Sequence, residues 1–476
     1  MPRFSKYFRL SLSQHQLDFV DVSNDFDTPV YVDPYAIETR NDVWAARASE
    51  HIRTFFEEVL ESIRDGDLDR ATGLMSHLTE PKETFLGVSR DNPRGRGVGR
   101  KQSRQLIDAI RSSRAYNSGL LTDLSEMALY VEGVDKDKIS DLTTNIIRGL
   151  LVEYTQQQCE LHGIETERYN GPPLWNADLR NWRSDFVQLP HIEADPVLLV
   201  PKYIVRRRLS IDSQEFYNKQ ITDFLIAENL KANSSLVQVI KKERRVFKKD
   251  VRQAKPKSKS LIAETVEAHP ELLELYKTIA REHPSLVTFD DDDEIPTLTA
   301  VCSDLAKLFS EIPAGRSHAN RYHELVVGAL TALFYPDLTL PKKEWEIHDG
   351  RKRIDLVFTN AAERGFFSHR RDDARVAANL VIVECKNYSS DIANPELDQL
   401  AGRFDENRGY LGLLTCRSSD DDELTLRRCR DMAVRRIGYI IVLTDADIVE
   451  MLLAKSKLQD ERIQSILNAK FRELIA

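Results

Sequence analysis

The stretch NLVIVECKNYSS, residues 379–390, contains an apolar run that ends in two ionisable side chains. Residues 380–383 (LVIV) are typical of a strand buried on both faces. Glu384 and Lys386 follow, with Cys385 between them. Because side chains alternate between the faces of a strand, Glu384 and Lys386 share one face and Cys385 takes the other. An ionised group is rarely buried without a partner, so this strand end predicts a functional site or an ion pair.

A second carboxylate lies in a predicted hairpin upstream. Its strands are 344–347 (EWEI) and 353–358 (RIDLVF), joined by the turn 348–350, and Asp355 interrupts the second strand. If the hairpin pairs with the strand 380–386, Asp355, Glu384 and Lys386 converge at one end of the sheet. Two carboxylates and a phosphate oxygen suit Mg²⁺, with Mn²⁺ as the alternative, and the ammonium can stabilise charge developing on phosphate.

Strands alternate with helices throughout residues 296–476. We expect helices at 297–310, 319–334, 395–406 and 422–436, a polar insertion at 360–378, further strands at 410–416 and 438–444, and a helical region from Asp445. This alternation predicts an α/β domain with a mixed sheet flanked by helices.

Asp355 followed 29 residues later by Glu384-Cys385-Lys386 resembles the signature of the PD-(D/E)xK, or restriction-endonuclease-like, nuclease superfamily. The predicted order helix, three strands, helix, strand is also similar to the superfamily core. Ile354 stands where many members have proline. The resemblance covers about residues 315–445 and does not extend to the N-terminal half.

The resemblance implies a Mg²⁺-dependent nuclease that hydrolyses DNA, with a role in restriction or defence against phage. It implies catalytic roles for Asp355, Glu384, Lys386 and Gln399, and metal ligation by Asp355, Glu384 and Glu324, the last on the helix before the hairpin. DNA is the expected partner, together with a homo-oligomeric assembly and a regulatory protein or nucleic-acid trigger.

Other interpretations stay open from the residues alone. Glu384 and Lys386 could form a structural pair on an edge strand, with Asp355 a surface charge. The chain could be a DNA repair or structure-specific nuclease. It could also be a sensor or assembly protein whose nuclease-like domain binds nucleic acid without cleaving it.

The remaining chain predicts a multidomain α/β protein. Its 476 residues exceed one ordinary core. Residues 1–235 indicate a helix-rich mixed α+β region for recognition, regulation or oligomerisation, with strands at 29–37 and 196–205 and helices at 48–66 and 140–163. Residues 236–295 indicate a charged helical connector, basic at 241–259 and acidic at 290–294.

The net charge of −9 limits nucleic-acid contact to local patches. The basic stretch offers Lys248, Lys249 and Arg252 as phosphate contacts, although a solvated charged helix would have the same sequence. Trp175 and Trp182 could be core residues or a base-stacking surface.

Five cysteines without a CxxC pair, and no apolar run near the roughly 18 residues that span a bilayer, predict a cytoplasmic protein that makes no membrane contact.

Overall fold

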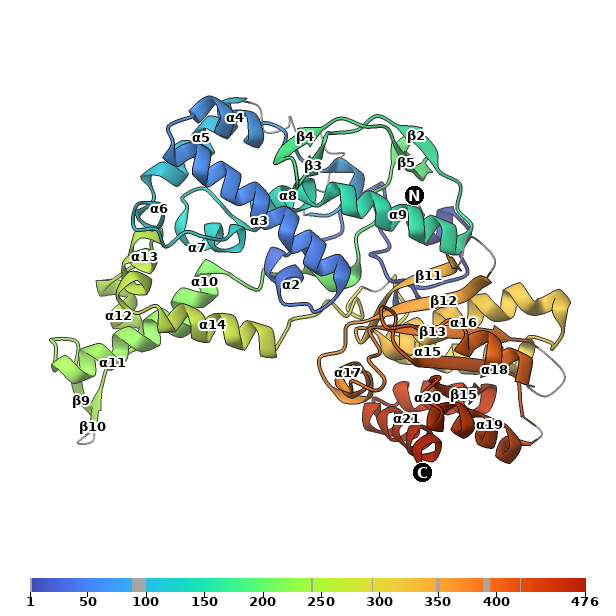
Figure 1. Ribbon diagram of the computed structural model, residues 1–476. Helices are drawn as coiled ribbons and strands as arrows, with labels where there is room; N and C mark the ends of the chain where they lie inside the picture. The colour runs from blue at the N-terminus through green and yellow to red at the C-terminus, as the bar shows by residue number, and fades with distance from the viewer. Residues whose placement is uncertain are drawn as a thin grey trace.

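The computed structural model describes residues 2–87, 100–240, 243–292, 294–347, 352–387, 394–419 and 421–476. The side chains of residues 100, 344–347 and 352–355 lie outside this description. The chain forms two lobes, the first coloured blue to yellow-green and the second yellow to red (Figure 1). Each lobe has its own cluster of buried apolar side chains. Among the described residues, no helix combines the length and apolar character needed to cross a membrane.

Helices dominate the N-terminal lobe. They are α1 (Phe4–Tyr7), α2 (Pro34–Glu38), α3 (Val43–Arg64), α4 (Leu68–Met75), α5 (Arg100–Ser112), α6 (Arg114–Asn117), α7 (Met127–Tyr130), α8 (Lys136–Ile146) and α9 (Arg148–His162). Short antiparallel pairs join β1 (Tyr31–Val32) to β8 (Val205–Arg206), β2 (Glu167–Tyr169) to β5 (Val187–Leu189), β3 (Leu174–Asn176) to β4 (Asn181–Arg183), and β6 (His191–Ile192) to β7 (Asp195–Pro196). A helix-rich mixed region is therefore confirmed.

Three predicted elements of this lobe differ from the structure. The strand at 29–37 is limited to β1, because Asp33 accepts a hydrogen bond from the Tyr35 amide and caps α2 at Pro34. The helix at 140–163 is two helices, α8 and α9, separated at Ile147. The strand at 196–205 is wrong for most of its length: after β7 the chain runs extended into a 3₁₀ turn at Lys202–Ile204.

The charged connector is helical, as predicted, and packs onto the N-terminal lobe. Its elements, together with the helices that lead into it, are α10 (Ser213–Phe216), α11 (Thr222–Ala232), β9 (Gln238–Ile240), β10 (Glu243–Arg245), α12 (Lys248–Ala254), α13 (Lys259–Ala268) and α14 (Glu271–Glu282). Buried Val251, Ile262 and Tyr276 belong to the core of the first lobe. The β9–β10 hairpin projects from this lobe at the left of Figure 1.

The C-terminal lobe contains α15 (Leu298–Glu311), α16 (Ala319–Phe334), β11 (Leu338–Ile347), β12 (Lys352–Asn360), α17 (Gly365–Asp372), β13 (Leu380–Lys386), α18 (Asn394–Ala401), β14 (Leu411–Cys416), α19 (Asp422–Val434), β15 (Tyr439–Thr444), α20 (Asp445–Lys455) and α21 (Asp460–Ile475). The predicted alternation of strands and helices is confirmed. The insertion at 360–378 contains α17, and the hairpin strands are longer than predicted. The turn predicted at 348–350 lies outside the described residues.

One five-stranded mixed sheet organises this lobe, in the order β11-β12-β13-β14-β15 (Figure 1). β11, β12 and β13 pair antiparallel, whereas β13, β14 and β15 pair parallel. The last pairs of the parallel ladders, Lys386↔Cys416 and Cys416↔Thr444, place the carboxyl ends of three strands at one edge. Ligand sites in open α/β sheets favour such an edge.

Candidate active site at the end of the central strand

Glu384 and Lys386 lie at the carboxyl end of β13, the middle strand of the sheet. The antiparallel partner β12 flanks β13 on one side and the parallel partner β14 on the other. The alternative interpretation placed Glu384 and Lys386 as a structural pair on an edge strand. That placement is wrong, because β13 is a central strand. Cys385, on the opposite face, is partly buried and packs against the core of the lobe, as predicted from strand alternation.

The Glu384 carboxylate is buried between two cations. Its side chain is 1% exposed, and Oε1 lies 2.6 Å from the Lys386 ammonium. Oε2 accepts a hydrogen bond from the guanidinium of Arg403, which is itself 1% exposed. A buried carboxylate requires such compensation, because desolvating an ion costs on the order of several kcal/mol. This strand end thus holds one anion and two cations in close contact.

Arg403 was not found by sequence reasoning, because the helix predicted at 395–406 ends at Ala401. Gly402 follows the helix, and the chain then turns back over the sheet. Phe404 packs against Gly412 of β14 and against Gly438, the residue before β15: a Cβ at Gly412 would lie 2.9 Å from Phe404, and one at Gly438 would clash with the same ring. The two glycines therefore admit Phe404, which holds the neighbouring Arg403 over Glu384. The helix-breaking Gly402 was the available sequence signal.

A second polar group lies just beyond the other parallel strands. Asp445, directly after β15, accepts a hydrogen bond from the Tyr322 hydroxyl at 2.9 Å and pairs with Arg417 at 3.1 Å. Burial raises the pKa of Asp445 to about 6. Burial also raises the pKa of the Tyr322 phenol, with Asp445 contributing. Because the strand ends are in register, this group belongs to the same edge of the sheet as Glu384.

Asn387 connects the strand end to the segment before α16. Its side-chain amide donates to the carbonyl oxygens of Pro313 and Gly315 at 3.2 and 2.9 Å, and the Gly315 amide donates to the Asn387 carbonyl. Asn387 is buried, and its Oδ1 has no hydrogen-bond partner among the described residues.

Asp355 lies in β12, but its side chain is outside the described residues. The described register of β12 with β13 ends at Leu356↔Val383, one position before Asp355 and Glu384. The predicted convergence of these two carboxylates therefore stays a prediction.

Two other predicted site residues lie apart from this cluster in the contacts that the structure describes. Glu324 is exposed on α16 and lines a pocket of about 500 Å³ with residues 8–12 of the N-terminal lobe; neither Glu384 nor Lys386 contributes to that pocket. Gln399 is exposed on α18. Within the described ranges, no group of three or more His, Cys, Asp or Glu is placed to hold a metal.

Of the three predicted Mg²⁺ ligands, Glu384 is the one whose side chain is described at this strand end. The two nearby cations fit a site that handles a phosphate, since they can offset its negative charge. The pair of carboxylates that such a site requires is completed by Asp355 in our prediction.

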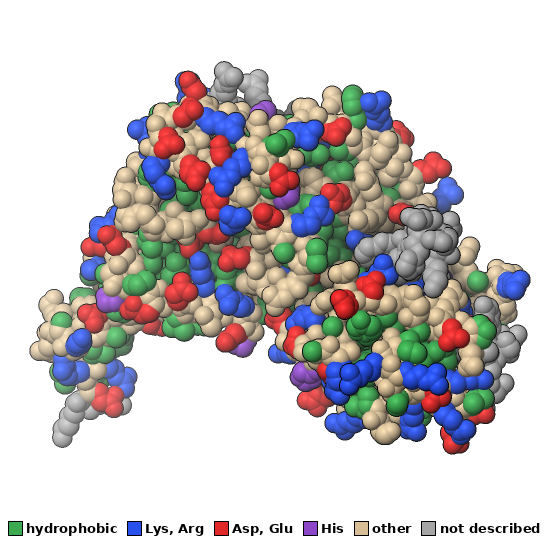
Figure 2. All heavy atoms as spheres, viewed as in Figure 1, with side chains coloured by type: hydrophobic (Ala, Val, Ile, Leu, Met, Phe, Trp, Pro, Cys, Tyr) green, Lys and Arg blue, Asp and Glu red, His purple; other side chains and the backbone are tan. Residues whose placement is uncertain are grey.

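The predicted nucleic-acid contacts lie on α12 of the first lobe. Lys249 and Arg252 are exposed, and the Lys248 ammonium lies 2.6 Å from the Asp223 carboxylate. The visible face of the molecule is hollowed between the projection formed by α11, α12 and the β9–β10 hairpin and the C-terminal lobe (Figure 2). The structure therefore places these cations at a distance from the sheet edge.

The two tryptophans are packing residues of the first lobe. Trp175 is buried, and its ring contacts those of Phe55 and Trp182 edge to face. Their indole N–H groups donate to Thr54 and to the Leu74 carbonyl. The core interpretation is thereby favoured over base stacking.

Comparison with known proteins gives one match. A family model described as a domain of unknown function (DUF8370) matches residues 9–212, which lie within the first lobe. No curated protein and no solved structure matches the chain.

Proposed function

We propose that the C-terminal lobe is a PD-(D/E)xK nuclease domain and that the protein is a Mg²⁺-dependent endonuclease acting on DNA, in restriction or anti-phage defence. The observation that carries the proposal is the buried Glu384 carboxylate beside Lys386 at the carboxyl end of the central strand. A carboxylate and an ammonium at this position serve phosphodiester chemistry, whereas apolar side chains would stabilise the sheet as well or better.

The topology supports the same proposal. The elements α16, β11, β12, β13, α18 and β14 follow the order helix, three strands, helix, strand that the resemblance implies. The first three strands are antiparallel and the fourth is parallel to the third. Fold alone does not define an activity, so the argument rests on the charged group at the strand end.

Each charged side chain has a role in the proposed reaction. Glu384 and Asp355 would hold the metal ion, which when bound supplies Lewis-acid polarisation of the phosphate and a bound water of lowered pKa. Lys386 stabilises the negative charge that develops on the phosphate oxygens. Arg403 is a positioning residue, because its guanidinium fixes the Glu384 carboxylate in one orientation. Overall, water adds to phosphorus and gives up a proton, the bond from phosphorus to the leaving deoxyribose oxygen breaks, and that oxygen takes up a proton.

Cleavage of supercoiled plasmid by the purified full-length protein tests the activity. We expect nicked or linear product with Mg²⁺ or Mn²⁺ and none with EDTA. With Ca²⁺ we expect DNA binding and little cleavage, because Ca²⁺ coordinates more loosely and polarises water less. Cleavage that persists in EDTA would contradict a metal-dependent reaction.

A second candidate function follows from the ion pairs themselves. Because Glu384 already pairs with Lys386 and Arg403, the group could serve structure alone, in a nuclease-like domain that binds nucleic acid without cleaving it. Tight DNA binding without product in either Mg²⁺ or Mn²⁺ would favour this sensor or assembly function.

A further inference from the structure

A pocket of about 400 Å³ lies between the two lobes. The start of α3 and part of α9 form its wall on the first lobe; β11, β12, the start of β13 and the turn before β14 form its wall on the second. Because Asn379 and Leu380 line it, the pocket lies at the amino end of β13, opposite the end that carries Glu384. We call it the interlobe pocket. Small-molecule sites have volumes of about 300–1,000 Å³ and favour such boundaries between domains.

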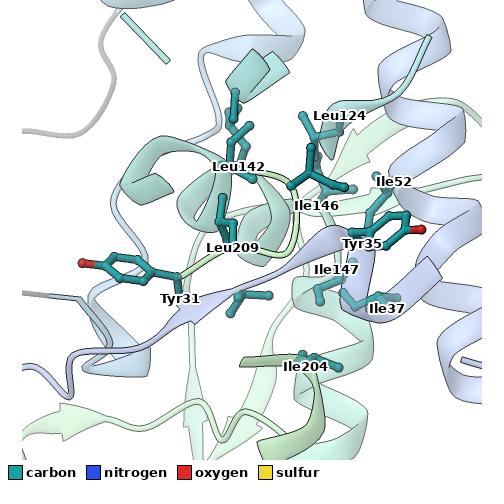
Figure 3. Close-up of a cluster of buried hydrophobic side chains, with 14 of the residues drawn as sticks. Tyr31, Tyr35, Ile37, Ile52, Leu124, Leu142, Ile146, Ile147, Ile204 and Leu209 are labelled. Atoms are coloured by element: carbon teal, nitrogen blue, oxygen red, sulfur yellow. The ribbon is translucent and has the colours of Figure 1, made fainter. Parts of the chain in front are cut away.

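Both walls of the interlobe pocket belong to packed, regular elements. On the first lobe, Ile52 of α3 and Ile147, the residue before α9, belong to one cluster of buried apolar side chains (Figure 3). On the second lobe, Val357 of β12 pairs with Lys342 of β11 and with Ile382 of β13. Packing and the sheet therefore fix the two walls, and the pocket is preformed, as small-molecule sites usually are.

The charges of the lining are balanced. Three acidic and three basic residues line the pocket: Asp42, Glu153, Asp405, Arg47, Lys342 and Arg408. Two ion pairs form within this set, Arg47 with Glu153 at 2.9 Å and Arg408 with Asp405 at 3.0 Å. With no excess of either sign, the lining gives little advantage to an anion or a cation, so an uncharged ligand fits it best.

Four carboxamide side chains line the same pocket. They come from both lobes and are Asn41, Gln157, Asn379 and Asn407. Within the described ranges, none of these four side chains makes a hydrogen bond. A carboxamide offers two N–H donors and a carbonyl acceptor. The set therefore matches a ligand whose edge carries donors next to acceptors.

Trp44 of α3 adds an aromatic surface and an unpaired donor. It lines the pocket and is only 9% exposed, and its indole N–H has no hydrogen-bond partner among the described residues. Buried indole N–H groups usually have a partner. Val43, Leu340 and Val357 extend the apolar lining. A planar ring can pack on this surface while the carboxamides bind its polar edge.

We infer that the interlobe pocket binds a nucleoside through its base. Nucleobases are flat and uncharged at neutral pH, and their edges carry the adjacent donors and acceptors that Asn and Gln side chains read. Enzymes that hold a single base do so in the same way, with apolar or aromatic side chains on its faces and hydrogen bonds on its edge. The site lies apart from the candidate active site, and the inference does not depend on nuclease activity.

Isothermal titration calorimetry on the full-length protein at neutral pH tests the inference. The probes are adenosine, guanosine, cytidine and thymidine, together with the 5′-monophosphate of each. We expect saturable binding of at least one nucleoside, and we expect its monophosphate to bind no more tightly, because the lining carries no excess positive charge. Asn407→Ala, Gln157→Ala and Trp44→Phe should each weaken binding about three- to tenfold, as loss of one hydrogen bond does.

The matched control is Gln105→Ala, which removes one exposed carboxamide from α5, outside the pocket. It should leave the affinity unchanged, and urea denaturation verifies that every variant is folded. The inference is overturned if no nucleoside binds saturably, or if Asn407→Ala and Gln157→Ala bind as the unaltered chain does. It is also overturned if a monophosphate binds more than about tenfold more tightly than its nucleoside, since the pocket would then recognise phosphate.

Discussion

Each lobe holds a carboxylate away from full solvent exposure, buried Glu384 in one and partly buried Asp141 in the other, but the two have different neighbours. In the C-terminal lobe, Glu384 lies between the cations Lys386 and Arg403. In the N-terminal lobe, Asp141 has carboxylate neighbours that disfavour its ionisation. The first group is compensated by cations of the same chain. In the second, repulsion between neighbouring carboxylates adds to the effect of burial on the Asp141 pKa.

The largest expected effect is on stability at the compensated site. Glu384→Ala leaves Arg403 and Lys386 buried without their carboxylate, so we expect a loss of about 3–5 kcal/mol in the free energy of unfolding. Urea denaturation measures it. A Glu384→Gln/Arg403→Met double variant removes the carboxylate together with one of its two cations and keeps Lys386, so part of this loss should be recovered. If the urea midpoint of Glu384→Ala equalled that of the unaltered chain, the ion pairs of Glu384 would contribute nothing to the stability of the fold.

Strand alternation gives the next prediction. Lys386→Met should lower the cleavage rate about 10²-fold, as loss of an electrostatic stabiliser does. Its neighbour Cys385, which packs into the core, is the matched control: Cys385→Ala should keep the cleavage rate and cost only packing energy. Plasmid cleavage and thermal denaturation of both variants decide the matter. If Cys385→Ala lost cleavage and Lys386→Met lost only stability, the face of β13 that we assign to the site would be the wrong one.

Substitution of Asp141 should change stability with the opposite sign. Because the folded-state pKa of Asp141 is raised to about 7, its ionisation destabilises the folded protein, and stability is lost as pH rises from about 4 through 7. Asp141→Asn should therefore increase the free energy of unfolding at pH 8 by about 1–2 kcal/mol and raise the melting temperature accordingly. At pH 4.5 the substitution should have little effect. The other ionisable side chains around Asp141 are kept unchanged; they are Glu80, Asp137, Asp27, Asp135 and Lys82. A variant less stable than the unaltered chain at pH 8 would contradict mutual repulsion.

Exposed cations provide the smallest expected effect. Replacing Lys248, Lys249 and Arg252 with Gln should lower DNA affinity and reduce the slope of log affinity against log salt by about 2 to 3. Lys248 contributes least, because it already pairs with Asp223. A control triple change of the exposed Arg53, Arg64 and Arg111 should leave the slope unaltered. An unchanged slope in the α12 variant would show that α12 is a solvated helix.

Much of the C-terminal lobe could be predicted from its sequence, since buried strands and amphipathic helices alternate there with clear periods. The strand of Glu384 and the opposite placement of Cys385 followed from alternation alone. Arg403 could not be predicted, because its position depends on Phe404 packing over Gly412 and Gly438. That contact is tertiary and leaves no local pattern.

The N-terminal lobe was less predictable for a related reason. Its strands are two or three residues long, too short for a period to show, and Asp33 and Ile147 end or divide elements through local backbone geometry. The carboxylates that line the pocket beside α8, those of Asp27, Glu80, Asp137 and Asp141, come from three segments spread over residues 27–141. Tertiary contacts assemble this set, so it leaves no local pattern in the sequence.

The central claim is that the Glu384 carboxylate serves phosphodiester cleavage, and one comparison tests it most directly. Plasmid cleavage with Mg²⁺ should be measured for the unaltered chain, for Glu384→Gln, and for Glu423→Gln, a change of an exposed glutamate on α19 whose side chain is 87% exposed. Circular dichroism at the assay temperature verifies that each is folded. We predict that Glu384→Gln lowers the rate at least about 10²–10³-fold and that Glu423→Gln does not. Equal cleavage by folded Glu384→Gln and the unaltered chain would contradict the account.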